Sequence, residues 1–319
     1  MTSLHTRRPA QRHTLAMFSL LVALVVTGCA TVSQPPFQQF ADSVQKVRSG
    51  ADSALGGLYD QARDRYVDET AQGGAALQGA LLTSVEGDPF AWTSSSSPPL
   101  FLQIARFRDG VYRFNSTLVD YAGALAQLAS PDLLKPETFD QLATDLNGNL
   151  RKALPALGVN PGNQPIAIFS TVATAAFRTY LQNKQRSSLV EALTKNQEAI
   201  QNTAMLGQSA VKITVIAMRS EYDLRSNALA QDLVRAGAPA AERSSKARAL
   251  VDLNDRFIKE LAVLRALNQS YVDLPAAHQE LAAATGDPKL GIAAIRRLYE
   301  QGREMERLYE QLSKDDKKK

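Results

Sequence analysis

The sequence predicts an all-α protein, an elongated bundle of some six to eight helices, several of them long and coiled-coil-like. Three observations favour this fold class. Apolar residues recur in steps of three and four along most of the chain, which places them on one stripe of a helix. The stretch 187–236 has no proline and a single glycine. Hydrophobic residues make up 45% of the chain, which is enough to bury a sizeable core.

The first 28 residues have the three-part layout of a secretory signal peptide. Arg7, Arg8 and Arg12 precede an uncharged run from Leu15 to Val26. This run is too short for a transmembrane helix, which needs about 20 apolar residues. We therefore expect residues 1–28 to be removed before the chain folds.

The apolar run ends at Cys29, the only cysteine of the chain. Val26, Thr27, Gly28 and Cys29 resemble the lipobox of bacterial lipoproteins. The resemblance implies that Cys29 is acylated on its sulfur, that the chain is cut between Gly28 and Cys29, and that the new amino group is acylated as well, with palmitate among the attached chains. The alternative is a buried structural cysteine in a first helix.

Acylation at Cys29 would determine where the protein resides. Two or more acyl chains hold a protein stably on a bilayer without spanning it. In bacteria that sort lipoproteins by the next residue, aspartate favours the inner membrane, and here that residue is Ala30. The resemblance therefore implies an outer-membrane anchor, with the protein facing the periplasm.

Net charge argues against a nucleic-acid partner. Cleavage after Gly28 removes three arginines and leaves 33 basic against 32 acidic residues. A phosphate backbone is bound through an excess of Lys and Arg, which the mature chain lacks. We expect membrane lipid and an envelope protein, or a second copy of the chain, as partners.

After a tether at 29–36, the helical domain is expected to span residues 37–319. A heptad-like stripe predicts its first helix, and this stripe continues less regularly to Tyr66 before the glycine-rich segment 71–82. The spacing leaves open whether the stripe packs within its own chain or against a copy. Its members are Phe37, Phe40, Val44, Val47, Ala51, Ala54 and Leu58.

The middle of the chain is predicted as two helices between breaks. Pro89–Pro99 is the clearest loop, because its serines and prolines give neither periodicity nor helix propensity. Prolines and glycine at 160–165 make a second break, so halves at 37–155 and 165–319 are possible. The helical positions between the breaks are Phe101, Ile104, Val111, Phe114, Leu118, Tyr121, Leu125 and Leu128, then Leu142, Leu146, Leu150 and Leu154.

Long helices dominate the second half. Ser188 and Glu191 form a possible capping box, which indicates either a fresh helix start or a bend. Residues 187–236 could then form one helix of up to ~75 Å. A further helix is expected over 250–271, and a last one begins at an Asp287 cap and carries Ile295, Leu298, Met305, Leu308 and Leu312.

Side chains that carry catalysis are scarce. His278 is the only histidine left after cleavage, which excludes a His-rich zinc site, and we expect it at the surface. The glycine patterns of serine hydrolases, Walker A loops and dinucleotide-binding turns are missing from the sequence. We therefore expect no catalytic, cofactor-binding or metal-binding residues.

Two short sequence patterns could suggest a catalytic serine or a metal site, but we expect neither. S-x-x-K strings begin at Ser43 and Ser209, but the K-T-G and S-D-N elements of acyl-serine enzymes are missing. Asp60, Asp64 and Asp68 lie four residues apart and would stack on one helix face. We expect that face to be solvated and not to bind a cation.

One segment raises a membrane-active alternative. Residues 153–177 contain no charge and could form an inserting tongue, as in helical pore-forming toxins. Prolines at 155, 161 and 165 do not allow a single spanning helix. We expect the segment to lie in the bundle core.

The sequence thus predicts a lipid-anchored periplasmic scaffold or adaptor of the bacterial cell envelope that is not an enzyme. Its anchor is specific, its helices are long and its catalytic groups are few. A membrane-perturbing protein of the pore-forming type and a ligand-binding or enzymatic bundle are the alternatives.

Overall fold

The computed structural model describes residues 32–71, 82–85, 88–94, 98–130, 135–159, 166–235, 239–287, 290 and 292–316. Within these ranges the chain forms seven α-helices and one two-stranded hairpin, so the all-α prediction is confirmed. The helices are α2 (Pro35–Ala71), α3 (Leu100–Leu128), α4 (Pro136–Ala153), α5 (Thr171–Asn183), α6 (Arg186–Leu233), α7 (Ala240–Gly286) and α8 (Ala293–Asp316).

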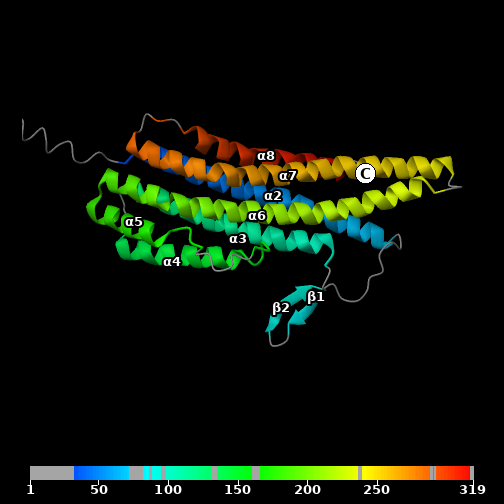
Figure 1. Ribbon diagram of the computed structural model, residues 1–319, viewed down its shortest axis with the longest axis horizontal. Coiled ribbons are helices and arrows are strands. Elements are labelled where there is room, and N and C mark those ends of the chain that lie inside the picture. Colours follow the sequence, from blue (N-terminus) through cyan, green and yellow to red (C-terminus); the bar gives the residue numbers. More distant parts are fainter. Residues whose placement is uncertain are drawn as a thin grey trace, which may run out of the picture.

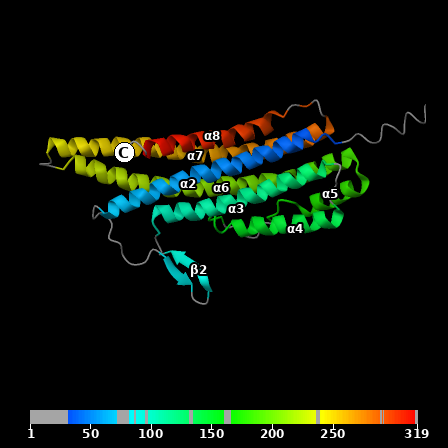
Figure 2. The ribbon, with the colours of Figure 1, turned by 180° about the vertical axis from the view of Figure 1, so that it is seen from behind.

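The long helices lie side by side along the long axis of the molecule (Figures 1 and 2). α2 packs against α3, α7 and α8, and α6 packs against α7 and α5. The short helices α4 and α5 cover one end of the bundle next to α3 and α6 (Figure 1). α2 begins at this same end, whereas the C-terminal end of α6 and the start of α7 lie at the far end of the molecule (Figure 1).

A single hydrophobic core runs from Phe37 in α2 to Leu312 in α8. All seven members of the predicted stripe 37–58 are at most 4% exposed, and they pack within their own chain. The ranges 37–155 and 165–319 both contribute to this core. The long-helix prediction for 187–236 is also confirmed, because α6 is continuous for 48 residues.

The prediction of a loop over Pro89–Pro99 is wrong for its first half. Residues Leu82–Val85 form strand β1 and Asp88–Ser94 form β2, paired antiparallel with Leu82 opposite Ser94. The hairpin lies to one side of the bundle, apart from its helices (Figure 1). β2 contains Phe90, Trp92 and Thr93, which are residue types that favour strands. The loop prediction gave more weight to the serines and prolines that follow them.

Two predicted caps do not hold the places expected of them. α5 begins at Thr171, where the Ser170 hydroxyl accepts a hydrogen bond from the Ala173 amide. α6 starts at Arg186 with Gln185 as its N-cap, so Ser188 is not the cap. Asp287 closes α7 instead of opening α8. Short polar residues occur at both ends of helices, and sequence alone does not say which end they occupy.

The contact between α2 and α8 depends on two glycines. A methyl group on Gly302 would lie 2.6 Å from the backbone carbonyl of Lys46, and one on Gly50 would clash with the Gly302 carbonyl. The two backbones therefore touch at this crossing. Only glycine permits this approach, because any other residue places a Cβ atom there.

We predict opposite effects for two glycine-to-alanine substitutions. Gly302→Ala should lower the free energy of unfolding by ~1–3 kcal/mol, because the new methyl group separates α2 from α8. Gly123→Ala in α3, where nothing lies within 4 Å of the new methyl group, should raise it by ~0.4–1 kcal/mol. Urea denaturation followed by circular dichroism measures both, and equal effects at the two sites would contradict the close approach.

Candidate functional site

The predicted lipidation site lies outside the described residues, as do all residues before Val32. In the sequence, Cys29 precedes Pro35, the first residue of α2, by six positions. The start of α2 lies at the opposite end of the bundle from the C-terminal end of α6 and the start of α7 (Figure 1).

A buried polar cluster forms where α3, α6 and α7 meet. It consists of Tyr121, Asn196, Gln197 and His278. The expectation that His278 lies at the surface is wrong, since its side chain is 0% exposed. α7 continues through Pro275 as a core helix, and the neighbouring helices supply hydrogen-bond partners for the imidazole.

The hydrogen bonds of this cluster fix the proton on the imidazole. The Gln197 amide group donates from Nε2 to the Pro275 carbonyl at 2.9 Å, so its Oε1 accepts. His278 Nδ1 lies 2.7 Å from that Oε1 and therefore carries the hydrogen. His278 Nε2 is left to accept from the Tyr121 hydroxyl at 2.7 Å, while Asn196 Nδ2 donates to the Tyr121 oxygen at 3.0 Å.

Burial keeps this cluster uncharged. It lowers the pKa of His278 to about 3, and it raises the pKa of Tyr121 well above its ordinary value. A histidine and a tyrosine in hydrogen-bond contact could act as an acid–base pair. Both side chains, however, are at most 1% exposed, so no substrate reaches them, and the cluster joins three helices instead.

Two asparagines hold the uncharged segment that precedes α5. Asn147 Oδ1 accepts from the amides of Ile168 and Phe169 at 2.8 and 3.1 Å, and Asn196 Nδ2 donates to the Ile168 carbonyl at 2.9 Å. Phe169 and Phe177 pack against Phe139, with ring centroids 5.2 to 5.6 Å apart. Ile168, Phe169 and Phe177 of the predicted inserting tongue thus belong to the core, whereas Val172 is 60% exposed.

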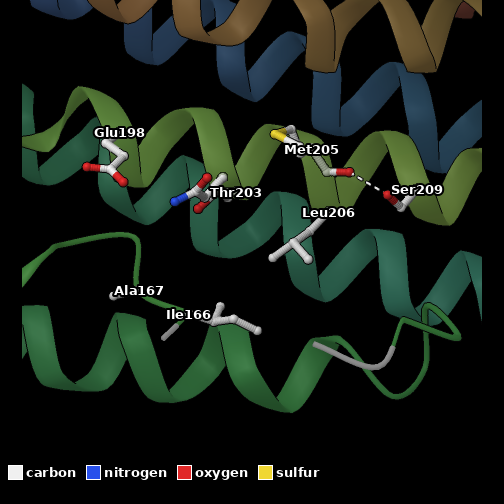
Figure 3. Close-up of a pocket in the computed structure, with 8 residues that line it drawn as sticks. Ile166, Ala167, Glu198, Thr203, Met205, Leu206 and Ser209 are labelled. Carbon is white, nitrogen blue, oxygen red and sulfur yellow. Dashed lines mark hydrogen bonds between the residues drawn. The ribbon is translucent and has the colours of Figure 1, made fainter. Parts of the chain in front are cut away.

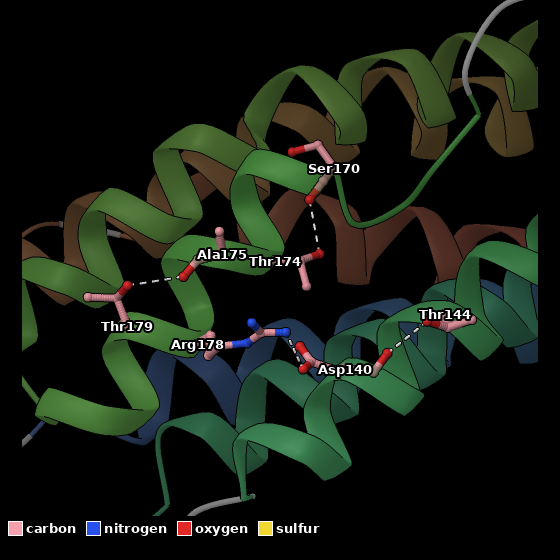
Figure 4. A network of polar contacts seen from close by, with 7 residues as sticks. All are labelled: Asp140, Thr144, Ser170, Thr174, Ala175, Arg178 and Thr179. Atoms are coloured by element: carbon pink, nitrogen blue, oxygen red, sulfur yellow. Dashed lines mark hydrogen bonds and ion pairs between the residues drawn. The ribbon is translucent and has the colours of Figure 1, made fainter.

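Polar contacts at the surface tie α5 to α4 (Figure 4). Arg178 of α5 forms an ion pair with Asp140 of α4. The hydroxyls of Thr144, Thr174 and Thr179 each donate to the carbonyl four residues earlier in their own helix. These hydroxyls satisfy helix backbone, as is common for such residues in helices, and they do not converge on a ligand.

The serines of the two S-x-x-K strings are not nucleophiles in this fold. Ser43 is buried and donates to the Gln39 and Ile295 carbonyls at 2.7 and 3.1 Å. Lys46 instead forms an ion pair with Glu306 at 2.6 Å. Ser209 is exposed and donates to the Met205 carbonyl at 2.8 Å. Neither serine bonds to a base.

Two carboxylates of the acidic series on α2 lie next to an arginine of the same helix. Asp60 and Asp64 both interact with Arg63 on the solvent side of the helix. Across the residues that the structure describes, no three His, Cys, Asp or Glu side chains are grouped so that they could hold a metal ion. In the same residues, no helix is both long and apolar enough to cross a bilayer.

Residues of α6 and the segment 166–167 line an open pocket of about 350 Å³ (Figure 3). Among the described residues that line it, Glu198 is the only ionisable one. The Ser209 and Thr203 hydroxyls at its wall donate to backbone carbonyls of α6. Both hydroxyl hydrogens are therefore engaged by the helix backbone.

A buried ion pair is the main polar feature that sequence reasoning missed. Arg65 of α2 donates to Glu260 of α7 at 2.8 Å, and the Glu260 side chain is 3% exposed. Burial raises the pKa of Glu260, while the charge of Arg65 opposes this shift. The two residues lie 195 positions apart, and nothing in their local sequence links them.

The buried imidazole predicts a pH-dependent stability. The unfolded chain takes up a proton near pH 6.5 and the folded chain only near pH 3, so stability is full above pH 6.5 and falls as pH drops. Between pH 6.5 and pH 5 the wild type should lose ~2 kcal/mol of unfolding free energy through this group. His278→Gln should remove that dependence. Guanidinium titrations at both pH values measure it, and equal losses in the two proteins would refute it.

No protein family, curated protein or solved structure matches this chain.

Proposed function

We propose that the mature chain is a lipid-anchored, non-catalytic scaffold or adaptor of the bacterial cell envelope, held at the outer membrane and facing the periplasm. The observation that carries the proposal is the lipobox-like sequence from Val26 to Cys29. Acyl chains on Cys29 would hold the end of the bundle where α2 starts against the bilayer. A protein partner, or a second copy, would then engage exposed helix faces.

The shape of the molecule supports this role. α7 has 47 residues, which corresponds to ~70 Å at 1.5 Å per residue. Its N-terminal end lies opposite the end of the bundle where α2 begins (Figure 2). An anchored protein of this shape presents its far end well away from the membrane surface.

The distribution of polar groups supports a non-catalytic role. Tyr121 and His278, the closest pair with acid–base chemistry, are buried between helices. The serine hydroxyls at 43 and 209 bond to helix backbone. The apolar side chains Ile168, Phe169 and Phe177 lie in the core, which disfavours the membrane-perturbing alternative.

The anchor is tested by replacing its sulfur. Cys29→Ser should incorporate no radiolabelled palmitate and should keep residues 1–28, seen as a higher mass of the chain, because a serine cannot form the thioether. Ser33→Ala, four residues further along the tether, is the matched control and should behave as wild type. Label in the Cys29→Ser chain, or a wild-type mature N-terminus distant from Cys29, would refute the proposal.

A further inference from the structure

The pair formed by α6 and α7 extends beyond the rest of the bundle (Figure 1). No described residue between 219 and 259 is buried. Within this arm the rings of Tyr222 and Phe257 stack at 4.3 Å and 12°, so α6 and α7 contact each other. α2 lies beside the base of the arm, and among the described residues no third helix lies beside its far end (Figure 2).

The outer face of α6 carries an uncharged stripe, which we call the α6 seam. Its residues follow one another in steps of three or four, as in one face of a coiled coil. None of them is charged. The members of the α6 seam are Asn202, Met205, Ser209, Ile213, Ile216, Ser220, Leu224, Asn227, Gln231 and Val234.

The apolar members of the α6 seam are exposed. The exposed fractions are 62% for Met205, 45% for Ile213, 69% for Ile216, 67% for Leu224 and 82% for Val234. Soluble proteins rarely leave a long apolar face uncovered, and such faces mark interaction sites. The chain from Met205 to Val234 therefore carries an exposed apolar side that begins beside the bundle and continues into the arm, where Leu224 and Val234 lie.

The dimensions of the α6 seam fit a pairing with a second helix of the same kind. From Met205 to Val234 it extends ~44 Å along the helix axis, which is about four heptads, the length typical of a stable coiled coil. Its five apolar side chains offer on the order of 500 Å². The polar members between them supply much of the rest of the ~800 Å² per partner of a standard interface.

We propose that the α6 seam joins two copies of this chain into a homodimer. An uncharged stripe is self-complementary, since a two-fold axis places the same residues of both copies against each other. A partner with a charged face would instead bury unpaired charges against it. Asn227, within the seam, would meet its own copy and fix the register, as buried asparagines do in parallel coiled coils.

The parallel orientation rests on the proposed function. If Cys29 of both copies is held in one membrane, both bundles stand the same way up and their α6 helices run in the same direction. In a parallel pair Ile216 faces Ile216 and Leu224 faces Leu224. The self-association itself needs no membrane and is tested separately.

Engineered cysteines test the pairing in the full-length chain. Cys29 is the only native cysteine, so the wild type gives the background. Ile216→Cys and Leu224→Cys should form disulfide-linked dimers in intact cells, because facing seam positions bring the two sulfurs within bonding range. Val67→Cys on α2, at a similarly exposed position of 57%, is the matched control and should stay monomeric. Equal cross-linking at positions 216, 224 and 67 would overturn the proposal.

The mass of the purified chain in detergent gives an independent measurement. Wild type should be a dimer. Ile216→Glu should raise its dissociation constant at least ~100-fold because the seam then buries a charge, and Val67→Glu should leave the dissociation constant unchanged. Circular dichroism checks that each variant is folded. A monomeric wild type would refute the dimer. If that monomer binds lipid vesicles and Ile216→Glu abolishes the binding, the α6 seam contacts lipid and not a second copy. The Cys29→Ser chain should still be a dimer. The lipid anchor and the dimer can therefore be refuted independently of each other.

Discussion

Burial of the apolar stripe of α2 is the constraint on which the rest of the structure depends. This one helix packs against α3, α7 and α8, so its stripe from Phe37 to Leu58 is the common surface of elements from both ends of the chain. The backbone contact at Gly50 and Gly302 sets how closely α8 approaches. Because α8 is the last helix, the bundle is completed only when the C-terminal part of the chain packs against α2. The fold is therefore a single cooperative unit in which distant segments stabilise each other.

Polar residues in the core have a different task from the apolar ones. Apolar contacts are non-directional and tolerate several helix registers, whereas a buried hydrogen bond is satisfied in only one arrangement. The chain Asn196–Tyr121–His278–Gln197 and the ion pair between Arg65 and Glu260 each join helices far apart in sequence. Together they favour one alignment of α2, α3, α6 and α7. Their cost is limited because most of their donors have an acceptor, although Arg65 Nε is buried without one.

Periodicity predicted most of the fold, because a helix stripe is a local property. The stripes of α2 and α3 and the unbroken length of α6 follow directly from residue spacing. The polar cluster could not be predicted: whether His278 is exposed depends on Tyr121 and Gln197, which lie 157 and 81 residues away. A polar residue within an apolar stripe, as Tyr121 is within that of α3, was the only available signal. The hairpin at 82–94 was missed because its strand formers are few and lie next to a serine run. The lipobox-like site remains a sequence prediction, since it lies before Val32.

Because the two helices of the arm are unbroken, the length of the arm depends only on how many residues they contain. Each residue of α6 and α7 adds ~1.5 Å, and between Met218 and Glu260 little besides the two helices depends on their length. Inserting one heptad into each helix would therefore move the far end outward by ~10 Å and leave the core around α2 untouched. Evolution or design could lengthen or shorten the reach of this protein without altering its fold. The number of residues in α6 and α7 thus sets how far the end of the arm lies from the bundle core.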